Sequence, residues 1–473
     1  MRQRLHSYPI LRENAVDDCR PPGCGKESPC HDARIHGTGS FRTTFVDTEP
    51  AAASSIGNQT RSSERPTQAR RGNCRLSRTE GRRSLRQTLF GVGPWHHDGP
   101  PPGRPRRDAR PPALRRWTVP RQDRMHIQQR GPEMTNADGA AWTARRRVKA
   151  VLAGQRPDRV PVSVWLHNFA REQRPEDLIA ETLRLQEKFD FDFLKPQSPA
   201  HSAPLLWGAE ISRPARADEW PVLTRPAVRT AFDLEGITRR PVGGMLADQI
   251  AVMRGVRAAL GPDVPIVATI FAPMMTLSLM HAEGKAGALK LMRSHPQSLH
   301  KALGAISETL TDFVEQVMEV GVDGLFYASN TCNRGEIDRQ EHDDFHAPFD
   351  AQILEACSGG WMNILHICGP AVQPEFFLDY VPQIFSWAQT PANPTAAEMH
   401  EMTGKVVLTG APGKPEFAET PTAELGRQVR SVLAEMDGMH QLVGPGCSIN
   451  PGVDEALIAA VVDATRFQPE LAA

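Results

Sequence analysis

Eight short apolar segments alternate with helical patterns between residues 160 and 447, and this alternation constrains the fold more than any other feature of the sequence. The apolar segments are rich in β-branched and aromatic residues and are bounded by turn formers, which is typical of buried strands. They span residues 160–166, 191–196, 264–271, 323–329, 362–368, 384–388, 405–411 and 441–447. Helical patterns occur at 175–189, 245–260, 284–293, 297–320, 341–357, 396–403 and 422–436.

Alternating strands and helices predict an α/β fold whose parallel sheet is covered by helices on both faces. Eight strands favour a closed (β/α)8 TIM barrel over an open, doubly wound sheet. No GxGxxG or GxxxxGK[ST] motif follows any of the strands, so a dinucleotide or P-loop site is not indicated. Residues 197–240 show weak periodicity, and we expect them to form a long connection over the barrel mouth, where such barrels keep their active sites.

Residues 1–133 differ in composition from the rest of the chain. They hold 24 Arg, one Lys (Lys26) and 13 acidic residues, whereas residues 134–473 hold 30 basic and 42 acidic residues, so the net charge of zero is a cancellation. The Arg- and Pro-rich composition of residues 1–133 predicts a disordered arm. It also suggests that the start codon is misplaced and that translation starts at Met134. The barrel domain is then expected at 134–473. The alternative is a nucleic-acid-binding arm. Interleaved acids and the lack of recurring aromatic residues make nucleic acid an unexpected partner.

The sequence also restricts where the protein is expected to work. No run of about 18 apolar residues could span a membrane, and residues 1–14 lack the apolar core of a signal peptide. Four of the eight cysteines lie in the barrel domain, which is too few for a disulfide framework of that size. We therefore expect a cytoplasmic protein with reduced thiols that are free to bind a metal.

A candidate metal site lies at the ends of two predicted strands. Within 362–368, His366 and Cys368 are two residues apart, so they point to the same face of a strand about 7 Å apart. Cys447 ends the eighth strand and would meet them over the mouth of a closed barrel. One imidazole and two thiolates suit Zn²⁺, with a fourth position left open as catalytic sites require. The alternative is that both cysteines are small buried apolar residues and that His366 is a core histidine.

From about residue 145 to residue 466 the chain resembles the uroporphyrinogen decarboxylase (URO-D) superfamily of (β/α)8 barrels. The likeness rests on short motifs spread along the barrel. They are RRRVKAVLAG at 145–154, DRVPV at 158–162, Pro273 with Thr276-Leu277 and Glu283-Gly284, GVDG at 321–324, NILHICG at 363–369 and GCSINP at 446–451. The superfamily contains decarboxylases of porphyrin and haem biosynthesis, and zinc-dependent methyltransferases that move a methyl group between a corrinoid and a thiol such as coenzyme M.

The resemblance is closer to the methyltransferase branch. The decarboxylases bind the carboxylates and pyrrole nitrogens of their tetrapyrrole substrate with an Arg-rich RQAGRY segment, an Asp, a Tyr and a His. They need no metal. This chain has LHNFAR at 166–171 instead, where only Arg171 could bind an anion, and it has Met280 and Cys447 at the Tyr and His positions. Its HxC and distant Cys resemble the zinc ligands of the methyltransferases, which implies one Zn²⁺ per chain held by His366, Cys368 and Cys447.

That branch implies a mechanism in which the zinc keeps a substrate thiol as a thiolate, which exchanges a methyl group with a corrinoid. Five further residues are candidates for substrate binding near the strand ends, namely Arg171, Asp192, Lys195, Tyr327 and Asn330. Barrel-rim hydrogen bonding explains each of the last four equally well. No Asp-x-His-x-x-Gly motif occurs, so a partner protein or free solution must supply the corrinoid. The methyl donor, the acceptor thiol, the direction of transfer and the oligomeric state, a homodimer included, stay open. A uroporphyrinogen III decarboxylase and a non-catalytic metal-binding barrel are the alternatives.

Overall fold

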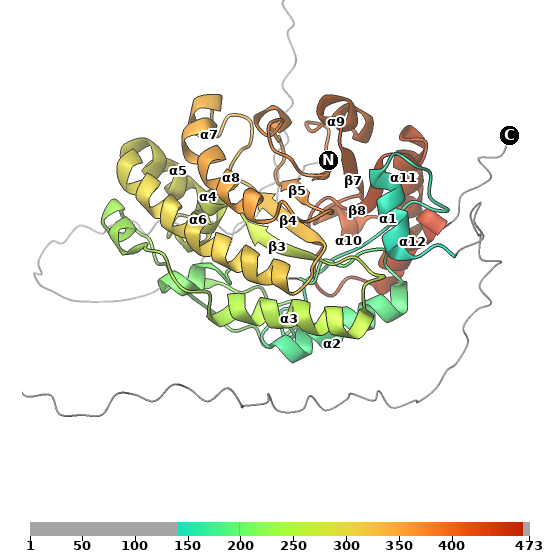
Figure 1. Cartoon of the computed structure of the whole chain (residues 1–473), viewed down its shortest axis with the longest axis horizontal. Coiled ribbons are helices and arrows are strands. Elements are labelled where there is room, and N and C mark those ends of the chain that lie inside the picture. The colour runs from blue at the N-terminus through green and yellow to red at the C-terminus, as the bar shows by residue number, and fades with distance from the viewer. Residues whose placement is uncertain (1–140, 198, 467–473) are drawn as a thin grey trace, which may run out of the picture. The chain divides into compact units, whose positions relative to one another are not determined.

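The computed structural model describes residues 141–197 and 199–466 (Figure 1). The arm predicted at 1–133 and the expected start at Met134 lie outside these residues. Within them, no helix is both long and apolar enough to cross a membrane.

Six strands form one parallel sheet in the order β3-β4-β5-β6-β7-β8, so strands that are consecutive in sequence are neighbours in space. Such strictly sequential pairing is the pattern of a (β/α)8 barrel rather than of a doubly wound sheet. The strands are β3 (Val267–Phe271), β4 (Gly324–Ser329), β5 (Ile364–Ile367), β6 (Ile384–Ser386), β7 (Val406–Ala411) and β8 (Gln441–Pro445). All six fall inside apolar segments predicted from the sequence.

The first two predicted strands close the barrel between β8 and β3. Val162 pairs in parallel with Val443 of β8, and Leu194 pairs in parallel with Ile266, just before β3. Between these two segments, the Asp192 amide donates to the Val162 carbonyl at 2.8 Å. The ring of eight strand segments is thus complete. Residues 160–166 and 191–196 contribute isolated bridges, including a second one between Leu166 and Ile449, rather than regular strands.

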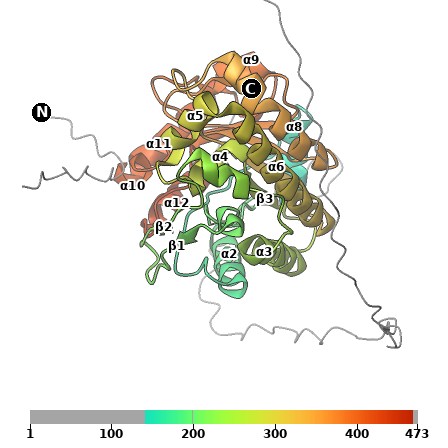
Figure 2. The ribbon, with the colours of Figure 1, turned by 90° about the vertical axis from the view of Figure 1, so that its left-hand side faces the viewer.

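Helices cover the outside of the barrel (Figures 1 and 2). The longer ones are α1 (Ala144–Leu152), α2 (Pro175–Phe189), α3 (Gly244–Leu260), α4 (Pro273–Met280), α5 (Gly284–Ser294), α6 (Pro296–Glu319), α8 (Ala347–Ala356), α9 (Ala396–Thr403), α11 (Thr422–Glu435) and α12 (Glu455–Arg466). The shorter ones are α7 (Arg339–Phe345) and α10 (Glu416–Glu419). Neighbouring helices pack in pairs, α2 with α3, α6 with α8, and α11 with α12.

Local sequence explains where several helices begin and end. Pro175 occupies the first turn of α2, Glu176 and Asp177 follow it, and Asp190 ends the helix in the left-handed conformation. The single helix predicted at 341–357 is wrong, because two helices, α7 and α8, occupy that segment. Pro348 lies in the first turn of α8, where its missing N–H has no helical acceptor to lose. In the interior of a continuous helix the same proline would interrupt the hydrogen bonds.

A buried carboxylate, that of Asp323, organises the base of the barrel, the end at which the strands begin. Asp323 accepts hydrogen bonds from Arg145, from Arg257, from the Trp361 indole and from the backbone of Ile266. Each of its two oxygens therefore has two donors. A charge buried to this extent is tolerated only when it is paired and fully hydrogen-bonded.

Residues 197–240 connect the second strand segment to α3 and carry short elements of their own, where a plain loop was predicted. These are two 3-10 turns (Pro204–Trp207 and Ala231–Gly236) and an antiparallel pair, β1 (Glu210–Ile211) with β2 (Leu223–Arg225). The connection reaches the end of the first strand segment, because the Phe169 amide donates to the Ala217 carbonyl at 3.1 Å. Trp220 packs there with its ring centroid 4.7 Å from that of Phe169. The connection therefore lies against the barrel mouth, as predicted.

Candidate metal centre

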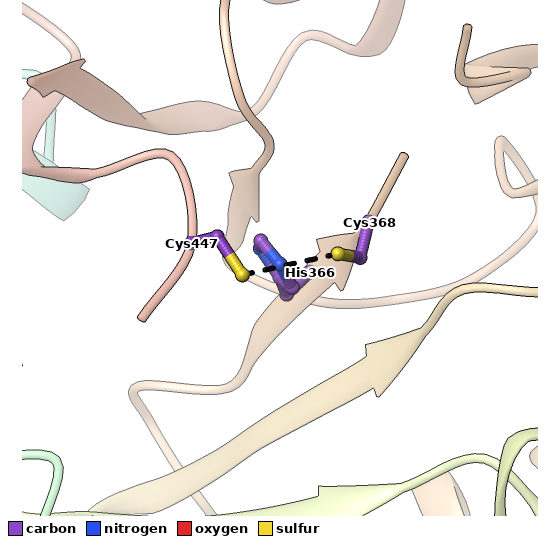
Figure 3. Close-up of side chains that lie close together, drawn as sticks. All are labelled: His366, Cys368 and Cys447. Carbon is purple, nitrogen blue, oxygen red and sulfur yellow. Dashed lines mark hydrogen bonds between the residues drawn. The ribbon is translucent and has the colours of Figure 1, made fainter. Parts of the chain in front are cut away.

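Three side chains with metal-binding atoms converge at the barrel mouth (Figure 3). One ligand atom each of His366, Cys368 and Cys447 lie within 4.8 Å of one another. The Sγ atoms of Cys368 and Cys447 are 4.0 Å apart. Two thiolates bound to one tetrahedral zinc, at Zn–S distances of about 2.3 Å, would be about 3.8 Å apart. The spacing therefore fits one ion and is far too long for a disulfide bond.

The position of His366 follows from strand geometry. It lies on β5 in register with Ser386 of β6, and the two side chains hydrogen-bond through Nδ1 and Oγ at 3.1 Å. On its other side the imidazole stacks on Phe326 of β4, with ring centroids 5.1 Å apart. A hydroxyl that holds Nδ1 leaves the Nε2 lone pair for a metal, which is the usual arrangement of a zinc-bound histidine.

A glycine allows Cys447 to reach the centre. A Cβ atom on Gly446 would lie 2.5 Å from the Cα of Ala388, which follows β6. Any other residue at this position would push the chain, and Cys447 with it, away from β5. The GCSINP motif therefore combines a ligand with the glycine that delivers it.

The pKa values of the two thiols shift in opposite directions. The hydrogen bond from the Cys368 thiol lowers the pKa of Cys447 well below its usual value, and His366 and Lys414 lower it further against the effect of burial. That same hydrogen bond, together with burial, raises the pKa of Cys368. The centre therefore favours a thiolate at Cys447, and a bound cation would also favour the thiolate form of Cys368.

The donor set fits zinc. Soft thiolates with one imidazole select Zn²⁺ among the common divalent ions. His366 is buried, whereas Cys368 and Cys447 are only partly buried, so the centre is anchored on the protein side and accessible on the other. Three protein ligands with one accessible side are typical of catalytic rather than structural zinc.

Two of the five candidate substrate-binding residues lie near this centre. The Lys195 ammonium is 4.7 Å from the ring centroid of Phe326, the ring on which His366 stacks. Burial lowers the pKa of Lys195 to about 8, against the opposing charges of Cys447 and Glu172. Asn330 follows β4, beside Cys368, whose amide donates to the carbonyl of Ser329. The Asn330 Oδ1 atom is buried and has no hydrogen-bond partner among the described residues.

The other three candidates do not join the centre. Asp192 begins its strand segment rather than ending it, and its carboxylate is held at the barrel base by Arg147, Arg159 and the amide of Val162. Tyr327 points outward from β4, opposite to Phe326, and donates to Asp350 of α8. These two placements correct the sequence analysis.

Arg171 is half-exposed, and its Nε atom lies 3.7 Å from a Glu181 oxygen of α2. The other two cysteines of the barrel domain, Cys332 and Cys357, also lie elsewhere. Cys332 is buried against His346 of the segment between α7 and α8, and Cys357 ends α8. Neither belongs to the converging group.

Sequence reasoning missed a buried polar chain beside the centre. Glu172 accepts from His167 Nδ1 at 2.9 Å, and His167 Nε2 lies 2.7 Å from the Gln197 amide nitrogen. That nitrogen also donates to Ser448, next to Cys447, while the Gln197 oxygen accepts from Lys195 at 3.2 Å. Gln197 and Ser448 follow predicted strands, so the strand-end rule could have identified them. Ser386 lies inside the predicted segment 384–388, because β6 ends earlier than predicted, so the strand-end rule does not identify it.

Comparisons with known proteins identify the family of the chain and proteins with a similar fold. The profile of the family described as uroporphyrinogen decarboxylase (URO-D) matches residues 143–467. The chain is similar to a solved methyltransferase from Methanosarcina mazei, at 20% identity and a TM-score of 0.60, over 69% of this chain and 98% of that one. A B12-independent methionine synthase from Shewanella sp. W3-18-1 matches at 16% identity and a TM-score of 0.42, over 62% of this chain and 85% of that one. A search of curated proteins gives no match.

Proposed function

The chain belongs to the uroporphyrinogen decarboxylase family, and within that family we propose that it is a zinc-dependent methyltransferase that moves a methyl group between a corrinoid and a thiol. The observation that carries the proposal is the convergence of His366, Cys368 and Cys447 within 4.8 Å. The fold shared with the Methanosarcina mazei methyltransferase is consistent with it.

The protein's own groups have distinct roles in this proposal. His366, Cys368 and Cys447 would hold the zinc, and the hydrogen bond between Ser386 and Nδ1 of His366 would orient the imidazole. The bound zinc supplies the positive charge that keeps a substrate thiol deprotonated at neutral pH. Two thiolate ligands reduce that charge, so the substrate sulfur stays electron-rich enough to react with a methyl group. The corrinoid comes from a partner protein or from solution.

A decarboxylase of tetrapyrroles is less well supported. Met280 is completely buried in α4, and Cys447 faces His366. Neither side chain offers the hydroxyl or imidazole that would bind the pyrrole nitrogens and carboxylates of a tetrapyrrole. The partly exposed arginine of the LHNFAR segment, Arg171, is turned toward Glu181.

Methyl transfer can be tested directly. Zinc-loaded protein is incubated with methylcobalamin and a panel of thiols, and demethylation of the corrinoid is followed by its absorbance while the thioether is identified by mass spectrometry. We expect turnover with at least one thiol, and none with the Cys447→Ala variant. If the wild-type protein holds zinc but none of the thiols supports demethylation of the corrinoid, the protein is instead a non-catalytic metal-binding barrel.

A further inference from the structure

Lys195 is a buried cation without an ionic partner. Its side chain belongs to the second strand segment of the barrel and is 6% exposed. Across residues 141–197 and 199–466 it forms no ion pair, and its one hydrogen bond goes to the neutral amide of Gln197. Buried lysines are rare unless they are paired, because removing an ammonium group from water is costly.

The nearest carboxylate does not supply the missing charge. Glu172 is engaged by His167 Nδ1 and by the backbone amide of Asn168, both at 2.9 Å. Its charge acts on Lys195 only through space. At least two of the three N–H donors of Lys195 therefore have no hydrogen-bond acceptor within the described part of the chain.

The surroundings direct this ammonium toward the metal centre. Trp165 and Phe326 form apolar walls, with their ring centroids 5.5 and 4.7 Å from Nζ. Phe326 stacks on His366, and Gln197, which holds Lys195, also holds Ser448 beside Cys447. Two separate routes thus connect Lys195 to two of the three ligand residues.

The orientation of Gln197 is fixed by its neighbours. His167 donates from Nδ1 to Glu172, which leaves Nε2 as an acceptor and requires the Gln197 nitrogen to face it. The amide oxygen then faces Lys195. Glu172 and His167 therefore hold the ammonium in place through one amide.

We propose that Lys195 supplies the counter-charge of the substrate thiolate in the barrel mouth, and that Glu172, His167 and Gln197 are the residues that position it. This inference rests on the proposed function, since it assumes a thiol substrate. With two thiolate ligands on one Zn²⁺ the centre is neutral, so an entering thiolate makes it an anion. A fixed cation nearby favours that anion in a site of low dielectric constant.

The test compares thiol binding with binding of the corresponding thioether. Zinc is replaced by Co²⁺ as a spectroscopic probe, and the affinity for 2-mercaptoethanol is measured from the thiolate-to-cobalt absorption. The S-methyl ether of the same compound, which carries no charge at sulfur, is measured by competition. Lys195→Met should bind the thiol about 10- to 100-fold more weakly at unchanged metal content, and the thioether as well as wild type does.

Three further variants sharpen the result. Lys195→Arg should keep most of the preference for the thiol, Gln197→Leu should lose part of it, and the exposed Lys301→Met should lose none. Should Lys195→Met not fold, Gln197→Leu and Lys195→Arg still report the effect. Three results for Lys195→Met would overturn the proposal. They are an equal loss of affinity for the thiol and the thioether, no loss of affinity, and a loss confined to a thiol with a carboxylate, such as 3-mercaptopropionate. Failure of the proposed function differs from all of these, because the wild type would then bind no metal or no thiol.

Discussion

Replacing Asp192 by Ala should destabilise the barrel without affecting the metal centre. Asp192 is 1% exposed and accepts from Arg159, from Arg147 at 3.3 Å and from the amide of Val162 at 2.9 Å. Its removal leaves the Arg159 charge and one backbone N–H without their partner. Breaking a buried pair in this way costs about 3–5 kcal/mol.

That loss can be converted into a melting temperature. Unfolding entropies near 60 °C are about 2.1 cal/mol/K per residue, so about 325 folded residues give roughly 0.7 kcal/mol/K. A loss of about 4 kcal/mol then lowers Tm by about 6 °C. Calorimetry on the zinc-loaded protein measures this shift, and metal analysis of the same samples should show unchanged zinc.

The exposed pair between Arg156 and Asp437 provides a matched control. Asp437 is 65% exposed on its side chain and has a φ of 50°, which Asn tolerates as well as Asp does, so Asp437→Asn should change Tm by less than about 2 °C. An Asp192→Ala variant that keeps its Tm but loses zinc or thiol binding would refute this reasoning. Asp192 would then be a residue of the functional site after all.

Three other outcomes are expected. Conversion of uroporphyrinogen III to coproporphyrinogen should be feeble or nil when the oxidised porphyrins are separated by chromatography, and turnover comparable to that of a dedicated decarboxylase would contradict the proposed function. Ser386→Ala should weaken zinc binding about 10- to 100-fold in competition with a chelator, because the His366 ring loses the hydroxyl that orients it; an unchanged affinity would mean that the hydrogen bond is incidental. Burial raises the pKa of Asp350 from 3.8 to about 6, so the folded state binds its proton more tightly than the unfolded state does. This contribution to stability is present below about pH 4 and is lost as pH rises through 6. Denaturant titrations of Asp350→Asn at several pH values should lack this loss, and an equal dependence of the free energy of unfolding on pH in both proteins would contradict the prediction.

The strand pattern predicted most of the fold because parallel barrel strands are buried on both faces. Six of the eight apolar segments contain the regular strands, and the other two close the ring. The helix α4 was missed because Pro273–Met280 is buried on nearly all sides and is apolar apart from Thr276 and Ser278, so it has no amphipathic period to distinguish it from a strand. The join between α7 and α8 was missed because a helical pattern continues across Pro348.

The candidate centre was partly predictable for a similar reason. Period-2 geometry places His366 and Cys368 on one face, but only the closed ring brings Cys447 to them. Tyr327 was misplaced because the strand-end rule identifies the correct end of a strand and not which face a side chain takes. The polar chain from Glu172 to Lys195 is joined by the contact between His167 and Gln197, which are 30 residues apart, and no local pattern encodes that contact.

Metal stoichiometry tests the central claim most directly. Protein purified without chelators, or reconstituted with Zn²⁺ and desalted, is analysed by elemental mass spectrometry as wild type, Cys447→Ala and Cys332→Ala. We predict one zinc per chain in the wild type and in Cys332→Ala, and a large loss in Cys447→Ala with an unchanged circular dichroism spectrum. A wild type that holds no zinc, or full occupancy in Cys447→Ala, would show that His366, Cys368 and Cys447 are ordinary barrel packing.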